Sequence, residues 1–140
     1  MKPIMGFQDE YRWLSNFWYS PITVIGIDYL NTEAAYQASK TIDINVREQF
    51  SKLNGSEAKR KGRTIELRSD WEMVKIESME LCLRAKFMTH KPLAEKLIAT
   101  GNRELIEFNT WGDTYWGKTQ KGGHNILGKL LMNIREDLTK

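Results

Sequence analysis

The chain has 140 residues, a formal net charge of +3 at pH 7, two histidines and one cysteine. A chain of this length fits one domain and buries roughly two-thirds of its unfolded surface, so it can fold without a metal or a disulfide. One cysteine excludes an internal disulfide, and two histidines argue against a multi-histidine metal centre. We therefore expect any chemistry to rest on carboxylates, lysines, hydroxyls and aromatic rings.

The distribution of apolar residues indicates the expected setting and the number of domains. The N-terminus lacks the apolar run of a signal peptide, and no stretch approaches the roughly 20 apolar residues that span a bilayer. We expect a cytoplasmic, reducing setting without membrane association. No repeat or Pro/Gly/Ser-rich linker interrupts the sequence. Residues 1–140 are predicted to form one compact multihelical domain, mainly α within the α+β class, with one or two short β-hairpins.

The first half of the chain begins with irregular or extended structure. Residues 22–30 are rich in β-branched residues and predict a short hairpin. Asn31 or Thr32 is expected to cap a helix that runs through residue 40, because both side chains can accept a bond from an exposed backbone N–H. Two further helices are predicted, over residues 44–53 and 56–62.

The second half is predicted to be mostly helical. Ser69 and Glu72 form a capping box before a long helix that ends near residue 90. Apolar residues at helical spacing predict its core-facing stripe: Met73, Ile76, Met79, Leu83 and Phe87. Cys82, beside this stripe, is expected to be a buried filler.

Two more helices are predicted near the C-terminus. Pro92 suits the first turn of one helix and Gly101 its end, and the last helix begins after Asn125. The segment between Gly101 and Asn125 is aromatic and glycine-rich, with a short strand over residues 105–108. Exposed loops on a rigid scaffold are common places for function.

Glu33 and Lys40 are the first candidate site residues. They lie seven residues apart on the predicted helix, nearly two turns, so their side chains share a face, with Tyr36 and Gln37 between them. The helix dipole favours the ionised form of Glu33 at the helix start. This suits a carboxylate that faces a developing positive charge. The alternative is a pair of solvent-exposed charges on a surface helix.

The loop around Trp111, Asp113 and Trp116 is the second candidate. Tryptophan rings stack on bases or sugars, and the glycine after each lets the backbone approach a ligand closely. Asp113 is a candidate second carboxylate. The alternative is a tight hairpin whose tryptophans close the core.

Two further groups are candidates for substrate binding. Lys59 and Arg63 share one helix face and could hold phosphate, or else form a solvated surface. An N-terminal aromatic segment could bind a ligand or only anchor the chain end. Its members are Arg12, Trp13, Ser15, Asn16 and Phe17.

Six segments, in order, resemble the motifs of the YbiA-like, or NADAR (NAD and ADP-ribose related), family of N-glycosidases. Residues 31–40 resemble its TEHxYQAxK helix, with Ala34 in place of the usual histidine. The other segments are residues 11–17, 58–63, 86–87, 110–117 and 123–128. The resemblance covers the chain nearly end to end.

This resemblance implies cleavage of N-glycosidic bonds on phosphorylated riboses. Members of the family act on early riboflavin-pathway intermediates or remove ADP-ribose from guanine in nucleic acid. A phosphorylated ribosyl or ADP-ribosyl substrate, free or on DNA or RNA, is therefore implied. The resemblance implies no metal, no nicotinamide cofactor and no obligate protein partner.

The expected mechanism stabilises positive charge at the anomeric carbon. One of Glu33 and Asp113 would stabilise the cation or position water, and the other would act as acid or base. Lys40 would attack the sugar to form a Schiff base, or would act by charge alone. The remaining residues would stack on the substrate, read its polar edges or neutralise phosphate: Phe17, Trp111 and Trp116; Asn16 and Asn125; Lys59 and Arg63. The rival interpretation is a non-enzymatic binder of nucleotides or single-stranded nucleic acid.

Overall fold

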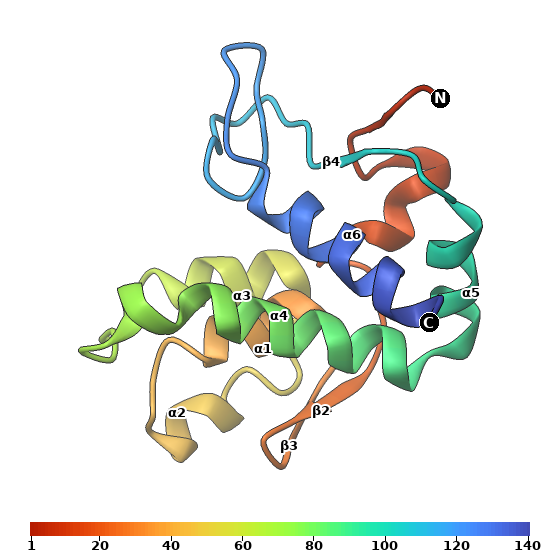
Figure 1. Ribbon diagram of the computed structural model, residues 1–140. Helices are drawn as coiled ribbons and strands as arrows, with labels where there is room; N and C mark the ends of the chain where they lie inside the picture. The colour runs from red at the N-terminus through yellow and green to blue at the C-terminus, as the bar shows by residue number, and fades with distance from the viewer. The chain divides into compact units, whose positions relative to one another are not determined.

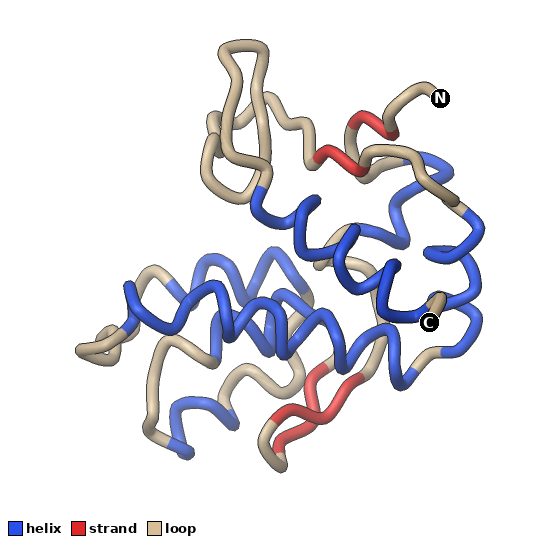
Figure 2. Tube along the Cα trace, viewed as in Figure 1, coloured by secondary structure: helices blue, strands red, loops and turns tan.

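The computed structural model describes residues 1–140; helices hold just under half of these residues, and the strands are short (Figures 1 and 2). The predicted class, mainly α with small β elements, is confirmed. The chain divides into two compact units: unit 1 is Met1–Ser15 with Lys91–Lys140, and unit 2 is Asn16–His90. The assignment of residues 1–140 to one domain stays a prediction. None of the helices is both long and apolar enough to cross a bilayer.

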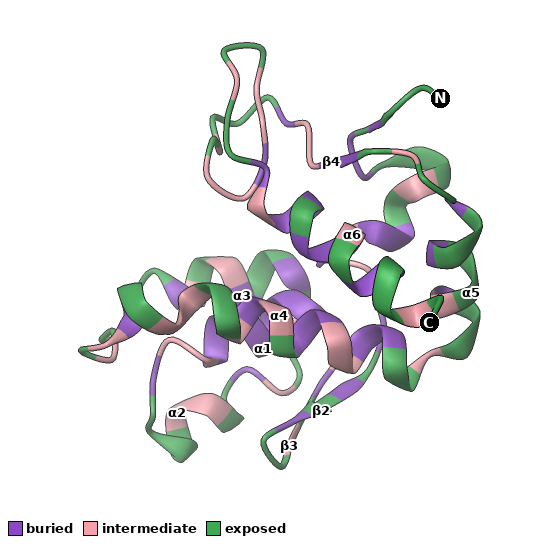
Figure 3. Cartoon of the chain, in the orientation of Figure 1, coloured by how far each residue is buried: buried purple, intermediate pink, exposed green.

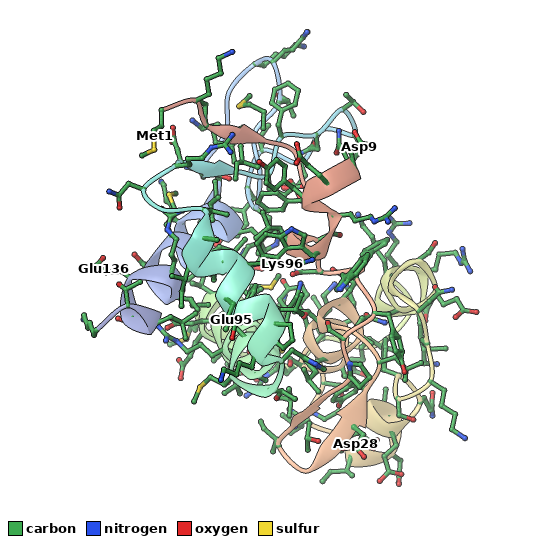
Figure 4. All side chains as sticks on the ribbon, turned by 90° about the vertical axis from the view of Figure 1, so that its right-hand side faces the viewer. Met1, Asp9, Asp28, Glu95, Lys96 and Glu136 are labelled. Carbon is green, nitrogen blue, oxygen red and sulfur yellow. The ribbon has the colours of Figure 1, made fainter.

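Unit 2 begins with a hairpin in which β2 (Ile22–Val24) pairs antiparallel with β3 (Ile27–Tyr29), as the sequence predicts. The two turn residues, Ile25 and Gly26, have φ angles of 48° and 79°. Positive φ at both positions is typical of the tight turn that matches strand twist. Thr23 donates a hydrogen bond of 2.6 Å across the hairpin to Asp28, which is labelled in Figure 4.

Helix α1 (Thr32–Ala38) follows the hairpin and is buried along its whole length (Figure 3). Asn31 caps it by accepting a 2.8 Å hydrogen bond from the Ala34 N–H, which confirms the predicted start. The helix packs against α3 (Gly55–Gly62) and α4 (Trp71–Thr89). Because α1 is enclosed, it is no surface helix, and its polar side chains lie inside the unit.

Two predictions for unit 2 were wrong in detail. α2 (Ile44–Glu48) is shorter than the predicted helix over residues 44–53. The N-cap of α4 is Asp70, which makes no side-chain capping bond, so Ser69 and Glu72 form no capping box there.

The predicted stripe on α4 is only half correct. Its last three members, Met79, Leu83 and Phe87, are buried as expected, whereas Met73 is 86% exposed and Ile76 is 40% exposed. The buried face of the first turns is set by Trp71. At about 100° per residue, Met73 lies about 200° around the helix from Trp71 and so faces away.

Unit 1 joins the two ends of the chain. β1 (Ile4–Met5) pairs in parallel with β4 (Leu105–Ile106), a shorter strand than the predicted 105–108. The 3-10 helix η1 (Asp9–Leu14), α5 (Lys91–Ala99) and α6 (Ile126–Leu138) complete it. Pro92 lies in the first turn of α5, and α6 begins after Asn125, as predicted.

Side chains of α5 and α6 fix unit 1 internally. The Lys96 Nζ lies 5.9 Å from the ring centre of Trp13 on η1 (Figure 4). The buried Arg135 guanidinium donates to the Thr100 hydroxyl at 2.9 Å and to the Arg103 carbonyl at 2.8 Å. α6 buries an apolar face, which includes Leu127, Leu130, Leu131 and Ile134.

Candidate active site

Glu33, the second residue of α1, presents a carboxyl group that is only 8% exposed. The Gln37 side-chain amide donates a 2.7 Å hydrogen bond to its Oε2. Burial raises the pKa of Glu33, while the Gln37 hydrogen bond, the charges of Lys59 and Lys40, and the Asn16 amide all oppose that rise. The alternative of a solvent-exposed carboxylate at this position is wrong. Glu33 is an enclosed acid surrounded by groups that favour its charged form.

Lys40 follows the end of α1 and is half-buried. Burial lowers the pKa of its ammonium group, the charge of Glu33 opposes this, and the charges of Arg63 and Lys59 lower it further. The Lys40 Nζ lies 5.9 Å from the ring centre of Tyr36. Lys40 therefore combines an electrostatic link to Glu33 with a greater tendency to lose its proton than an exposed lysine has.

Lys59 and Arg63 belong to the end of α3, a helix that starts at a capping box between Asn54 and Glu57. Lys59 is half-buried and acts by charge on both Glu33 and Lys40, whereas Arg63 is exposed and acts on Lys40. The two cations are therefore part of the same electrostatic cluster. A group of positive charge next to a buried carboxyl suits a substrate that carries phosphate.

Asn16 and Phe17 lie at the N-terminal edge of unit 2. The Asn16 carbonyl accepts a 3.0 Å hydrogen bond from the Glu33 N–H, and its side chain donates to the Met79 Sδ at 3.4 Å. Phe17 is 45% exposed, and its ring lies so close to Gly55 that a Cβ there would overlap it. The Phe17 ring is thus held by α3 and still open to a stacking partner.

Tyr36 is a more enclosed member of the predicted site. It is 6% exposed and packs against Trp71, with ring centres 5.4 Å apart and a tilt of 51°. Trp71 is a core residue at the start of α4.

Three buried side-chain oxygens near Glu33 have no hydrogen-bond partner: Asn16 Oδ1, Thr32 Oγ1 and Gln37 Oε1. An orphaned buried polar group costs about 1–3 kcal/mol, so a cluster of three marks a place where something besides stability shapes the structure. Neither Thr32 nor Gln37 is assigned a role in the site by the sequence motifs. The signal was present for Gln37, since residues four apart on a helix share a face.

Unit 2 also contains a groove of about 510 Å³ that no sequence motif predicts. It is lined by residues 41–43, Val46, Gln49 and residues 65–69. One of its lining residues is bonded to the segment that follows α1, because the Arg68 N–H donates a 2.7 Å hydrogen bond to the Lys40 carbonyl.

Asp113, in unit 1, organises the loop between β4 and α6. Its Oδ1 accepts hydrogen bonds from the N–H groups of Tyr115 at 3.0 Å and Trp116 at 2.9 Å. Its own N–H and carbonyl bond to the Asn109 amide at 3.0 and 2.9 Å. One carboxylate oxygen therefore holds the loop. A catalytic use of Asp113 stays a prediction.

The two tryptophans of this loop differ in exposure. Trp111 is 62% exposed beside Gly112, whose φ angle of 87° favours glycine. Because Trp111 faces solvent, it does not close the core, and the hairpin alternative is wrong for this residue. Trp116 is half-buried and meets the Tyr115 ring edge-on, with ring centres 5.0 Å apart.

Asn125 fastens β4 to the start of α6. It is 1% exposed and has a left-handed φ of 53°. Its Oδ1 accepts from the Glu107 N–H and its Nδ2 donates to the Leu105 carbonyl, both at 2.9 Å. Both ends of the amide are engaged within unit 1, and its predicted contact with substrate stays a prediction.

The predicted N-terminal aromatic segment is divided between the two units. Arg12, Trp13 and Ser15 belong to unit 1, whereas Asn16 and Phe17 belong to unit 2. Arg12 is exposed, Ser15 is half-buried and Trp13 is 6% exposed.

The remaining reactive side chains form no further centre. Cys82 is fully buried, and burial raises its pKa to about 12, which confirms it as a filler of the core. No three His, Cys, Asp or Glu side chains lie close enough together to bind a metal.

The sequence motifs of this chain match those of a known protein family. The sequence model of the NADAR domain matches residues 5–139. The chain belongs to the NADAR family. The N-glycosidase YbiA of Escherichia coli K12 is 41% identical over 134 residues, which cover 93% of this chain and 83% of that protein. A riboflavin biosynthesis protein of Vibrio vulnificus is 36% identical over 134 residues, 93% of this chain but 36% of that longer protein.

The NADAR assignment extends to the fold. The NMR structure of E. coli YbiA matches with a TM-score of 0.85 and 38% sequence identity. The match covers 99% of this chain and 87% of that one. The resemblance drawn from the sequence motifs is therefore confirmed, together with the YbiA-like fold.

Proposed function

We propose that this protein is an N-glycosidase that hydrolyses the bond between a nitrogen and the anomeric carbon of a phosphorylated ribosyl substrate. The observation that carries the proposal is the buried carboxyl of Glu33, held by an amide donor and close to the charges of Lys59 and Lys40. The N-glycosidase name of the E. coli relative supports the same reaction.

In the proposed reaction the bond from nitrogen to the anomeric carbon breaks and its electron pair leaves with the nitrogen. Positive charge then develops on the anomeric carbon and the ring oxygen, and the ionised carboxylate of Glu33 stabilises it. A water oxygen bonds to the anomeric carbon, and the proton that this water loses ends on the departing nitrogen. Asp113 is the candidate second carboxylate, as acid or base for that proton.

Lys40 has two possible parts in this scheme. Its positive charge can bind phosphate or hold Glu33, which is the simpler role. Its lowered pKa also supports a role as nucleophile. The neutral amine bonds to the anomeric carbon, the original nitrogen leaves with the electron pair of its bond and takes a proton from the amine, and the bond from the anomeric carbon to the ring oxygen then opens to give a Schiff base, which water hydrolyses. Borohydride reduction during turnover would add the mass of the sugar to Lys40 in the second case and leave the mass unchanged in the first.

The other predicted site residues serve binding in this proposal. Lys59 and Arg63 neutralise phosphate, and the exposed rings of Phe17 and Trp111 stack on planar groups. A modified base in a duplex would have to leave the stack to reach these residues. The candidate substrates are ADP-ribosylated guanine, free or on nucleic acid, and an early intermediate of riboflavin synthesis, both in a cytoplasmic setting.

The test is to incubate the protein separately with an ADP-ribosylguanine oligonucleotide and with the riboflavin-pathway intermediates. Mass spectrometry of the products should show a free base or amine and a free phosphorylated ribose or ADP-ribose from one of them. If neither substrate is cleaved although each binds, the protein is a binding module. Binding by charge alone would weaken steeply with salt.

A further inference from the structure

The side chain of Gln37 is enclosed between the Glu33 carboxyl and the backbone of Gly62. Its Nε2 donates to Glu33 Oε2 at 2.7 Å, and the residue is 5% exposed. Its Oε1 lies against Gly62, where the Cβ of any other residue would overlap the amide. Gly62 also lies on the buried face of α3 that packs against α1. The space for the Gln37 amide therefore depends on the absence of a side chain at position 62.

This arrangement is poor for stability and well suited to holding Glu33. The Gln37 Oε1 is buried without a hydrogen-bond partner, which an apolar residue of the same shape would avoid. The Asn16 side chain shows the same pattern, since it too interacts with Glu33 through its amide while its Oδ1 has no partner. Both amides thus favour the charged form of one carboxyl group while their own oxygens have no partner, and the Gln37 donor bonds to that carboxyl group directly.

We propose that Gln37 is a positioning residue that fixes the orientation of the Glu33 carboxyl group and favours its ionised form, and that Gly62 provides the space in which Gln37 does so. The proposal rests on the proposed function, in which Glu33 acts as a carboxylate. In this proposal Glu33 stabilises the cation, and another group transfers the proton.

The charged groups near Glu33 favour its ionised form, although burial outweighs them and the pKa of Glu33 stays above its ordinary value. Lys40 follows α1 and Lys59 comes from α3, and both act on Glu33 by charge. From α4 the nearby titratable group is Cys82, whose thiol stays neutral because burial raises its pKa to about 12. Only burial itself opposes ionisation, and the hydrogen bond from Gln37 counteracts it more than any other neighbour does.

The test compares Gln37→Leu with Asn45→Leu, a matched change from an amide to leucine at an exposed residue of the same unit. Loss of a hydrogen bond to a charged group should lower kcat at least about tenfold, with KM within about twofold. Activity requires the ionised form, so it falls as pH drops through the pKa of Glu33. Without the donor that pKa rises, and this acid limb moves to higher pH. Asn45→Leu should match wild type.

A second readout does not depend on turnover. Titration of the ¹³C-labelled Glu33 carboxyl by NMR should give a higher midpoint in Gln37→Leu than in wild type. If Gln37→Leu does not fold, Gln37→Asn withdraws the amide by one methylene and should move the midpoint in the same direction. Gly62→Ala should do so as well, whereas Ser56→Ala, exposed on the same helix, should not.

The outcomes separate this proposal from the proposed function. A folded Gln37 variant with unchanged kcat, acid limb and NMR midpoint would overturn the positioning role while hydrolysis by wild type stands. A raised midpoint in a protein that cleaves neither candidate substrate would remove the proposed function and leave the Gln37–Glu33 contact in place. An acid limb that moves to lower pH would also contradict the proposal.

Discussion

Both amide atoms of Asn125 in unit 1 have backbone partners, whereas near Glu33 in unit 2 three buried side-chain oxygens have none. The first arrangement is what a structural residue requires, because buried polar groups are ordinarily satisfied. The second leaves a stability cost in place. The comparison teaches that hydrogen-bond satisfaction distinguishes the residues that hold this fold from those that surround the buried carboxyl group of Glu33.

Asn125 offers the largest expected effect on stability. Asn125→Ala removes both hydrogen bonds, leaves the Glu107 N–H and the Leu105 carbonyl unpaired, and places alanine at a positive φ. We expect a loss of about 2–4 kcal/mol in the free energy of unfolding, measured in urea. Asn133→Ala, exposed on α6, is the control and should be near neutral. Equal stability of the two variants would contradict the structural role of Asn125 in unit 1.

Asp113 lies between the two classes, because one of its oxygens is engaged in the loop. Asp113→Asn keeps an Oδ1 acceptor for the Tyr115 and Trp116 N–H groups but removes the charge. If Asp113 is the second carboxylate, turnover should fall about tenfold or more with the melting temperature unchanged. Asp113→Ala removes both the charge and the Oδ1 acceptor, so its turnover and its melting temperature should both fall. Full activity in Asp113→Asn would show that Asp113 only stabilises the loop.

Thr32 gives the smallest and sharpest prediction. Thr32→Val replaces a fully buried, unpartnered hydroxyl by a methyl group of similar shape. The free energy of unfolding should stay the same or rise by up to about 1 kcal/mol, as measured by thermal melting. A decrease of more than about 1 kcal/mol in the free energy of unfolding would show that the hydroxyl has a partner. The number of buried oxygens without a partner near Glu33 would then fall to two.

The sequence predicted local structure well where neighbouring residues determine it. The hairpin over residues 22–30, the Asn31 cap and the start of α6 depend on turn and capping chemistry within a few residues. The family and the importance of residues 31–40 followed from motifs. Met73 and Ile76 were misplaced because apolar spacing does not say which side of α4 is covered.

Contacts between distant segments were beyond the sequence. Gln37 lies one helical turn from Glu33, yet its role depends on Gly62 of another helix. The exposure of Trp111 and the satisfied amide of Asn125 likewise depend on how the 107–125 loop returns to α6. Such features follow from tertiary packing, which spacing along the chain does not encode.

The most direct test of the central claim is the turnover of Glu33→Gln on whichever candidate substrate wild type cleaves. The claim predicts a loss of at least about 100-fold with the fold intact, because the amide cannot stabilise the developing cation. Glu77→Gln, an exposed carboxylate on α4 in the same unit, should keep wild-type turnover. A folded Glu33→Gln protein with turnover within about threefold of wild type would contradict the claim that Glu33 is the reactive carboxylate.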